Sequence, residues 1–230
     1  MENALMINPT QDWNPRQARM KQLLRDKSGF AEAIRLCLEL HGMVHFSEVA
    51  KRRTMADELW EGLSEEDFAV IPRGSEFSIA WYFWHVARIE DLTVNLLIAG
   101  GDQILDDKWM KNLGACARDT GNAMDDDETI ALSRSLDKKW LRKYRNAVGL
   151  RTRSVVKSLK PADLKRKVEK SGLDRILAEG GVLEDENSVW LLDFWGKKDV
   201  GGLLMMPVTR HQLVHLNDCA KIRKKIGKGL

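Results

Sequence analysis

Histidines are scarce in this 230-residue chain, and four of the five fall into two pairs with the same spacing. His41 and His45 form one pair, and His211 and His215 form the other. Side chains four residues apart lie on one face of an α-helix, about one turn from each other, so both imidazoles of a pair can bind one ion. The spacing therefore predicts a divalent-metal site wherever such a pair faces the interior.

His85 is the expected third ligand. It lies in an apolar segment, on the same helical arc as Trp81 and Ile89. Three protein ligands leave coordination positions open for water or substrate, as catalytic sites require. A buried histidine that is only hydrogen-bonded is the alternative for each ring. The pattern is thus compatible with one divalent ion bound by His85, His211 and His215, and equally with three hydrogen-bonded core histidines. An all-imidazole ligand set favours zinc or nickel and is compatible with iron or manganese.

Four long amphipathic segments would position these histidines. Apolar residues recur in each of them at the three- and four-residue spacing of a helix. The helices are expected over residues 30–53, from 75 or 78 to 100, over 129–159, and from just after Pro207 to about 227. Alternating patterns are short, and there is no Asn-Gly or Asp-Gly hairpin signal. The sequence predicts an all-α fold, a four-helix bundle with additional short helices.

The domain organisation is expected to be simple. Residues 1–29 are interpreted as an N-terminal arm and a short helix, with a loose arm over the first fifteen, and residues 30–230 as a single helical bundle domain. Residues 115–128 are expected to form an irregular connector. Its acidic end, 125–128, lacks the ligand spacing of a calcium-binding loop and is better explained as a helix N-terminus.

Composition and charge exclude several classes of protein. Apolar residues make up 43% and charged residues 31%, which is typical of a folded chain. The net charge of +3 is small and spread out, so no nucleic-acid partner is expected. The longest apolar stretch, 79–99, carries too many polar residues to span a membrane. Three cysteines without metal or redox spacing, and no signal-peptide pattern, predict a cytoplasmic protein.

Further residues are candidates for the surroundings of the metal: His45, Trp81, Tyr144 and Arg151. The role of the pair that contains His45 stays open between a local hydrogen bond and a partner or proton shuttle near the ion. Trp81 would form an apolar wall beside His85, or simply pack in the core. Arg151 shares an arc with Tyr144, and it either pairs with an anionic substrate or extends past the end of the bundle.

Two segments resemble the DinB/YfiT-like superfamily: residues 78–91 around His85, and residues 209–217 around the His211–His215 pair. Residues 136–155 are also similar to the third helix of that family. The resemblance implies a four-helix bundle, commonly a homodimer, in which one histidine of the second helix and a His-x-x-x-His of the last helix bind a metal. By position, it assigns the ligands to His85, His211 and His215.

The function implied by the resemblance is metal-dependent chemistry on a small-molecule substrate. Some relatives transfer a low-molecular-weight thiol, and others isomerise a small substrate with a thiol cofactor. A divalent ion would lower the pKa of a bound thiol or water. No carboxylate lies between His211 and His215, so hydrolysis with a built-in base is disfavoured. The alternatives are a non-enzymatic, metal-stabilised helical dimer with a stress-response or binding role, and a bundle with purely structural histidines.

Overall fold

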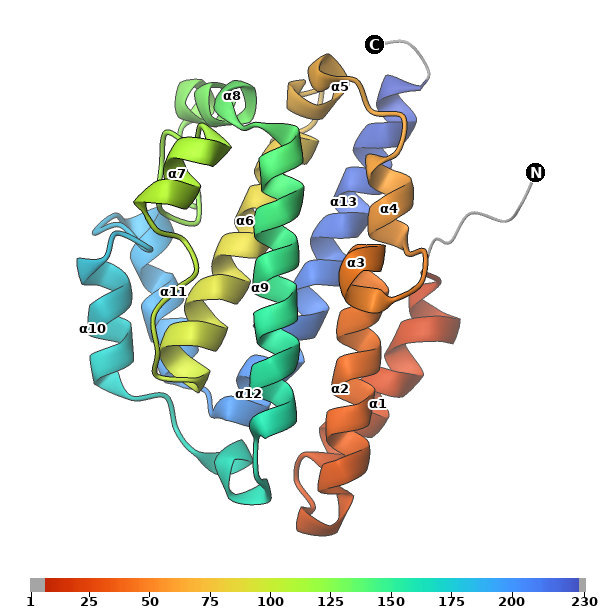
Figure 1. Cartoon of the computed structure of the whole chain (residues 1–230), viewed down its shortest axis with the longest axis vertical. Helices are drawn as coiled ribbons and strands as arrows, with labels where there is room; N and C mark the ends of the chain where they lie inside the picture. The colour runs from red at the N-terminus through yellow and green to blue at the C-terminus, as the bar shows by residue number, and fades with distance from the viewer. Residues whose placement is uncertain (1–6, 228–230) are drawn as a thin grey trace.

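Four long helices form the bundle: α2 (Phe30–Val44), α6 (Ile79–Asp91), α9 (Lys138–Ser158) and α13 (His211–Ile226). In the computed structural model, which describes residues 7–227, α6 packs against α9 and α13, and α2 packs against the same two helices (Figure 1). The four helices thus enclose one core. The described residues contain no β-strand, only one isolated bridge. The predicted all-α bundle with additional short helices is confirmed.

Shorter helices connect and cover the bundle. On one side α1 packs against α2. On the other side α10 packs against α11 and against η3, the segment that follows α6 (Figure 1). The short elements are η1 (Pro9–Trp13), α1 (Asn14–Leu23), η2 (Lys27–Gly29), α3 (Ser47–Ala50), α4 (Met55–Trp60), α5 (Glu65–Ala69), η3 (Leu92–Ile98), α7 (Asp107–Leu113), α8 (Asp126–Ser135), η4 (Pro161–Lys165), α10 (Lys170–Ala178), α11 (Glu186–Gly196), α12 (Val200–Met205) and η5 (Met206–Arg210).

Helix α6 is the central element and begins where the sequence suggests. The Ser78 hydroxyl accepts a hydrogen bond from the Trp81 amide at 3.0 Å and caps the helix. The helix continues through the π-helical segment η3 to Gly100, which has a φ of +66°. It is buried on all faces, including Arg88 and Asp91. A helix in the centre of the bundle has no solvent side, so its charged arc must find partners inside the protein.

Two of the predicted helices are interrupted. The first ends at Val44 instead of running to residue 53, and His45 is extended (φ −101°, ψ 164°). The third is divided into α8 and α9, because the Asp137 carboxylate accepts from the Trp140 amide at 2.8 Å and starts a new helix. The predictions of unbroken helices were wrong at both places. A side chain that caps a helix can end one helix and start another even where the apolar spacing continues. The apolar spacing alone therefore does not predict such breaks.

The last helix begins earlier than predicted. Helix α12, the π-helical turn η5 and α13 follow one another without a loop. Pro207 has no amide hydrogen, and the chain widens around it, so that the His211 amide donates to the Met206 carbonyl across five residues. This wide turn sets the direction in which every later side chain of α13 points.

The N-terminal arm and the acidic connector also have defined structure. Residues 1–6 of the predicted loose arm lie outside the described residues, whereas Pro9–Trp13 are helical and Trp13 is fully buried. At the end of the connector, the Asp125 carboxylate accepts from the Glu128 amide at 2.8 Å, and the Glu128 carboxylate accepts from the Asp125 amide at 3.1 Å. This capping box confirms that the acidic run is a helix N-terminus.

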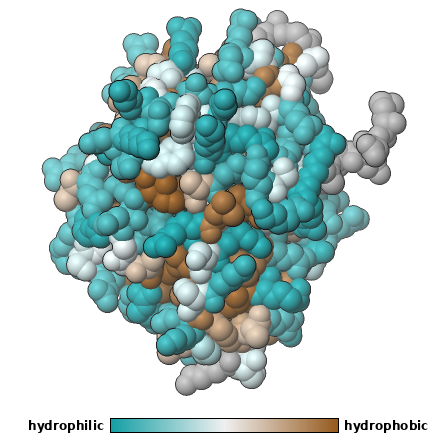
Figure 2. Space-filling view, viewed as in Figure 1, coloured by the Kyte–Doolittle hydropathy of each residue, from teal (hydrophilic) through white to brown (hydrophobic). Residues whose placement is uncertain are grey.

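The surface is largely hydrophilic, as the face in Figure 2 shows, with small hydrophobic areas between charged groups. Among the described residues, the large apolar side chains that remain exposed are Leu150, Leu183, Val189, Trp190 and Val214. No helix in the described part of the chain combines the length and the hydropathy needed to cross a membrane.

Candidate metal centre

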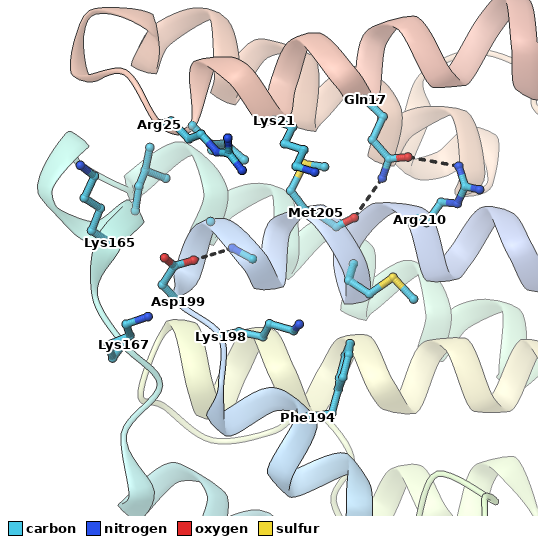
Figure 3. A pocket seen from close by; sticks show the side chains of 15 residues that line it. Gln17, Lys21, Arg25, Lys165, Lys167, Phe194, Lys198, Asp199, Met205 and Arg210 are labelled. Atoms are coloured by element: carbon cyan, nitrogen blue, oxygen red, sulfur yellow. Dashed lines mark hydrogen bonds between the residues drawn. The ribbon is translucent and has the colours of Figure 1, made fainter.

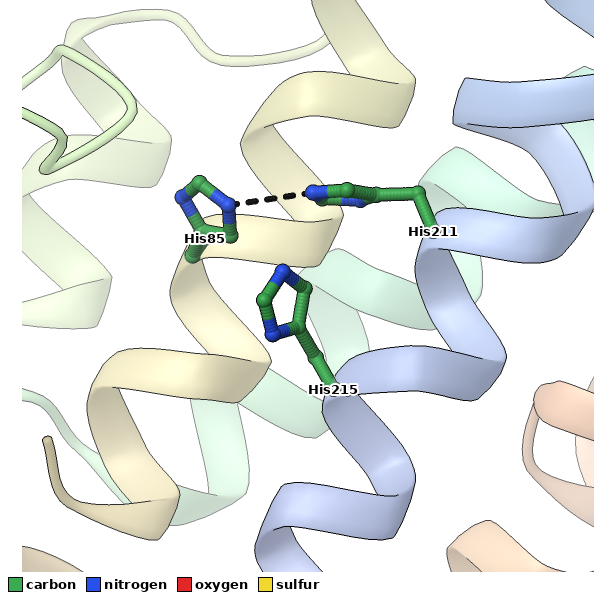
Figure 4. A group of neighbouring side chains, drawn as sticks. All are labelled: His85, His211 and His215. Carbon is green, nitrogen blue, oxygen red and sulfur yellow. Dashed lines mark hydrogen bonds between the residues drawn. The ribbon is translucent and has the colours of Figure 1, made fainter. Parts of the chain in front are cut away.

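One ring nitrogen from each of His85, His211 and His215 points toward a common centre (Figure 4). The three nitrogens lie within 4.8 Å of one another, and the Nε2 atoms of His85 and His211 are 3.2 Å apart. Nitrogens bound to zinc at about 2.0–2.1 Å in a tetrahedron are roughly 3.4 Å apart. The predicted ligands from two different helices are therefore brought together at a spacing that fits a divalent ion.

Two of the three imidazoles are held by their other nitrogen. His85 Nδ1–H donates to the Thr120 carbonyl at 2.7 Å, and His215 Nδ1–H donates to the Asp218 carboxylate at 3.3 Å. A carbonyl oxygen can only accept, so the proton of neutral His85 lies on Nδ1 and its Nε2 presents a lone pair. Metal-binding histidines are oriented in this way. His211 Nδ1 has no partner among the described residues.

The Thr120 carbonyl is positioned by a tight turn. The Asp119 carboxylate accepts from the Gly121 amide at 2.6 Å, and Gly121 has a φ of +81°. A Cβ atom at Gly121 would lie 2.7 Å from Nε1 of Trp81, so glycine is required there by conformation and by space. The buried Trp81 ring stacks on His85, with centroids 4.6 Å apart.

Burial keeps these three histidines neutral. Burial, together with the neighbouring His215, lowers the pKa of His85 to about 3. The pKa values of His211 and His215 are also lowered by burial. Neutral imidazole is the form that binds a metal ion, so little free energy is needed to deprotonate these ligands near pH 7.

An apolar cavity of about 310 Å³ adjoins His211 and His215. Its lining consists of Ile89, Asn122, Trp190, Leu191, Phe194, Trp195, Met206, Pro207, His211 and His215. Besides the imidazoles and the two indoles, Asn122 is the polar side chain in this lining, and the lining contains no carboxylate. Trp190 is 49% exposed, so it stands at the solvent side of the cavity. A small, mainly apolar molecule would fit beside the histidines.

The other histidine pair faces a buried carboxylate that the sequence reading missed. Nε2 of His41 lies 2.8 Å from one carboxylate oxygen of Glu90, and Nε2 of His45 lies 2.9 Å from the other. Gln212 Nε2 also donates to Glu90 at 2.9 Å. With both imidazoles donating, the carboxylate accepts three N–H bonds. Burial raises the pKa of Glu90, but His45 and His41 outweigh it and hold that pKa well below its usual range.

This second cluster differs from the first in how its rings are supported. A nitrogen each of His41 and His45 and an oxygen of Glu90 also lie within 4.8 Å of one another. However, the Nδ1 atoms of both imidazoles are buried without a partner among the described residues, whereas in the first cluster this holds for one ring of three, His211. If Nε2 bound a metal, each Nδ1–H would be an unsatisfied buried donor, whereas a neutral ring that donates through Nε2 leaves only an unused lone pair. We therefore interpret this cluster as a hydrogen-bonded clamp.

The clamp joins the two helices that carry the three-histidine cluster. Gln212 on α13 donates both to Glu90 and to the Val86 carbonyl of α6, at 2.9 and 3.1 Å. Gln212 directly follows His211 in the chain. His45 therefore has the local hydrogen bond that was one of its two expected roles. Because Gln212 follows His211, the same clamp also fixes how α13 is aligned with α6 at the three-histidine cluster.

Two of the predicted neighbours lie elsewhere. The Tyr144 hydroxyl donates to Asp91 at 2.6 Å and accepts from Arg88 at 2.9 Å, within the buried charged network of α6. Arg151 is exposed and donates to Asn95 of η3 at 3.3 Å. Neither residue lines the cavity beside the histidines. The arc that they share faces η3 and the far side of α6.

The buried clamp predicts a loss of stability in acid. Burial lowers the pKa of His45 to about 3, against the opposing effect of Glu90, whereas an unfolded histidine titrates near 6.5. Between these values the unfolded chain binds the proton and the folded chain does not, so the free energy of unfolding falls as pH falls below about 6.5. His45→Gln should remove up to about 1.4 kcal/mol per pH unit of this dependence.

Urea unfolding of metal-free protein between pH 7.5 and 4.5 measures this effect. The groups facing His45 are His41 on α2, Glu90 on α6 and Arg145 on α9, and all three are retained in both proteins. Identical pH dependence in the variant and the parent chain would show that His45 already accepts a proton in the folded state.

Comparison with known proteins identifies a family. The family model for the DinB superfamily matches residues 48–217, which include all three histidines of the cluster. A search of curated proteins found no match.

Proposed function

The chain belongs to the DinB superfamily, and on that premise we propose that it is a metal-dependent enzyme that transfers a low-molecular-weight thiol to a small apolar substrate. We further propose that His85, His211 and His215 bind one divalent ion, with zinc or nickel favoured over iron or manganese. Isomerisation of a small substrate with a thiol cofactor would use the same site.

The observation that carries the proposal is the convergence of three neutral imidazoles, two of which, His211 and His215, line an apolar cavity. The ligands come from α6 and α13, and Thr120 and Asp218 fix the rings of His85 and His215. When bound there, a divalent ion supplies Lewis acidity that lowers the pKa of a coordinated thiol. The surrounding residues hold the His85 and His215 rings in the required tautomers, and burial keeps all three imidazoles uncharged.

The lining of the cavity favours thiol chemistry over hydrolysis. A hydrolase needs a general base within reach of the attacking water, and no carboxylate lines the cavity. A thiol needs no additional strong base once its pKa is near neutrality, because the thiolate is itself a competent nucleophile. The indole and aliphatic side chains exclude water from the space where an apolar electrophile would lie.

Turnover assays with metal-loaded protein test the proposal. A panel of low-molecular-weight thiols is combined with small apolar electrophiles, and thiol consumption and thioether formation are measured. His211→Ala should lower kcat/KM by more than about 100-fold, since even groups that only support a metal ligand contribute 10–100-fold. Lys224→Ala, an exposed change on the same helix, should leave kcat/KM unchanged.

The outcomes separate the enzyme from its main rival. Thioether formation that His211→Ala abolishes in a folded protein supports the transferase. No turnover with any pair of reactants, in protein that retains its metal, would instead favour a non-enzymatic, metal-stabilised helical protein. Protein purified without an affinity tag that neither contains metal nor gains thermal stability from added zinc, nickel or manganese would contradict both.

A further inference from the structure

A cleft of about 800 Å³ lies between α1, the η4 segment and α12 (Figure 3). Cationic side chains from several separate segments line it: Lys21, Arg25, Lys165, Lys167, Lys198 and Arg210. Asp199 is the single carboxylate in the lining, and it accepts from the Gly202 amide at 2.8 Å as the cap of α12. Six cations and one carboxylate thus concentrate positive charge in this lining, although the net charge of the whole chain is only +3.

The cations of the cleft are left uncompensated. Within residues 7–227, none of the six forms an ion pair with a carboxylate. Elsewhere on the same N-terminal helix the opposite holds: Arg16 pairs with Glu39 at 2.8 Å, and Arg19 pairs with Glu32 at 3.0 Å. A concave surface lined by one sign of charge focuses the electrostatic field and concentrates ions of the opposite sign.

Two of the cations are oriented by neutral groups. Arg210 donates to the side-chain oxygens of Asn14 and Gln17, at 3.0 and 3.3 Å, and Gln17 is itself anchored by its bond to the Met205 carbonyl (Figure 3). The Lys198 ammonium lies 4.2 Å from the centroid of the Phe194 ring. Amide oxygens and an aromatic face position these charges without neutralising them, so the cations keep their capacity to bind an anion.

The cleft adjoins the cavity of the metal centre. Phe194 and Met206 line both spaces. Arg210, which lines the cleft, directly precedes His211, which lines the cavity. One ligand could therefore place charged groups in the cleft and an uncharged part beside the histidines.

We propose that this cleft binds the phosphate or carboxylate groups of a small organic polyanion whose uncharged part extends past Phe194 and Met206 into the metal cavity. The anion site stands on the cleft alone, whereas the extension rests on the proposed function. The substrate or thiol of the enzyme would then be a molecule with several negative charges at one end and its reactive group at the other.

Calorimetry on chelator-treated protein tests the anion site. Inorganic pyrophosphate and citrate are the probes, and the tighter of the two identifies phosphate or carboxylate as the preferred group. Lys167→Met/Lys198→Met should weaken binding at least about tenfold, because each variant side chain removes a charged hydrogen-bond donor to the anion. Lys139→Met/Lys157→Met removes the same charge from exposed positions on α9 and should leave affinity unchanged. Failure of the protein to bind either probe, or equal weakening in both double variants, would overturn the proposal.

A second measurement tests the extension into the cavity. Hexyl phosphate should bind more tightly than inorganic phosphate and should change the tryptophan fluorescence, and Trp190→Phe should remove most of that change. Equal affinity for the two probes would refute the extension. Because these measurements need neither metal nor turnover, they can fail while the transferase stands, and they can succeed when no thiol is transferred.

Discussion

Replacing His215 with alanine is expected to lower the affinity for zinc by more than about 100-fold. The variant removes one of three converging nitrogens and leaves two imidazoles, which cannot define a tetrahedral site with the protein alone. His215 is the most accessible of the three rings and packs beside Tyr82, so its removal should disturb the core least. Competition of the metal-loaded protein with a zinc chelator measures the change.

Matched variants locate the ion. Val214→Ala alters the adjacent residue, which is 40% exposed, and should leave zinc affinity unchanged. His45→Gln tests the second cluster, which we interpret as a hydrogen-bonded clamp and which should not change the bound stoichiometry. Full zinc affinity in His215→Ala, combined with loss of zinc in His45→Gln, would place the ion at the cluster of His41, His45 and Glu90 and contradict the assignment.

Glu90→Ala should destabilise the folded state by about 3–5 kcal/mol, more than any surface substitution. The carboxylate is fully buried and accepts from His41, His45 and Gln212. Its removal leaves these donors unsatisfied, and an unsatisfied buried donor costs about 1–3 kcal/mol. It also leaves the buried Arg145, whose pKa burial lowers to about 10, without the negative charge that opposes this shift. The midpoint of urea unfolding, with an unchanged slope, reports the loss.

Two further substitutions separate the clamp from general effects. Glu61→Ala removes an exposed partner of Arg53 and should cost less than about 1 kcal/mol. Glu90→Gln keeps the shape of the side chain but presents an amide hydrogen to one imidazole, so its cost should lie between those of the two alanine variants. A loss of less than 1 kcal/mol in Glu90→Ala would mean that water or a rearranged side chain satisfies the three donors.

The sequence contained the fold and the centre of the site because both depend on helical periodicity. The His211–His215 spacing and the apolar arc of His85 are set by the 3.6-residue turn, and the structure brings the three rings together as expected. Trp81 stacks on His85 for the same reason, since it lies one turn earlier on the same helix. The metal and the homodimer stay predictions.

The sequence could not predict the hydrogen-bond partners of the histidines, because no regular spacing in the sequence marks them. Thr120 acts through its backbone carbonyl, so its residue type carries no signal. Glu90 belongs to a helix that is buried all round, and only the packing of α2 against its neighbours shows which donors it meets. A buried carboxylate within an apolar segment, together with a histidine pair on another helix, was the clue that was available. Periodicity also left two alternatives open for Arg151, because only the packing shows that its arc faces η3 rather than the histidines.

The wide turn η5 determines the rotation of the last helix about its own axis. Each residue of an α-helix rotates the next by about 100°, so the residues that follow a turn inherit its angle. The extra width around Pro207 lets consecutive side chains serve two compartments, with Arg210 in the basic cleft and His211 in the apolar cavity. Chain length within this turn is therefore under tighter constraint than residue identity. A one-residue deletion would rotate both imidazoles of α13 away from His85 while leaving every ligand present in the sequence.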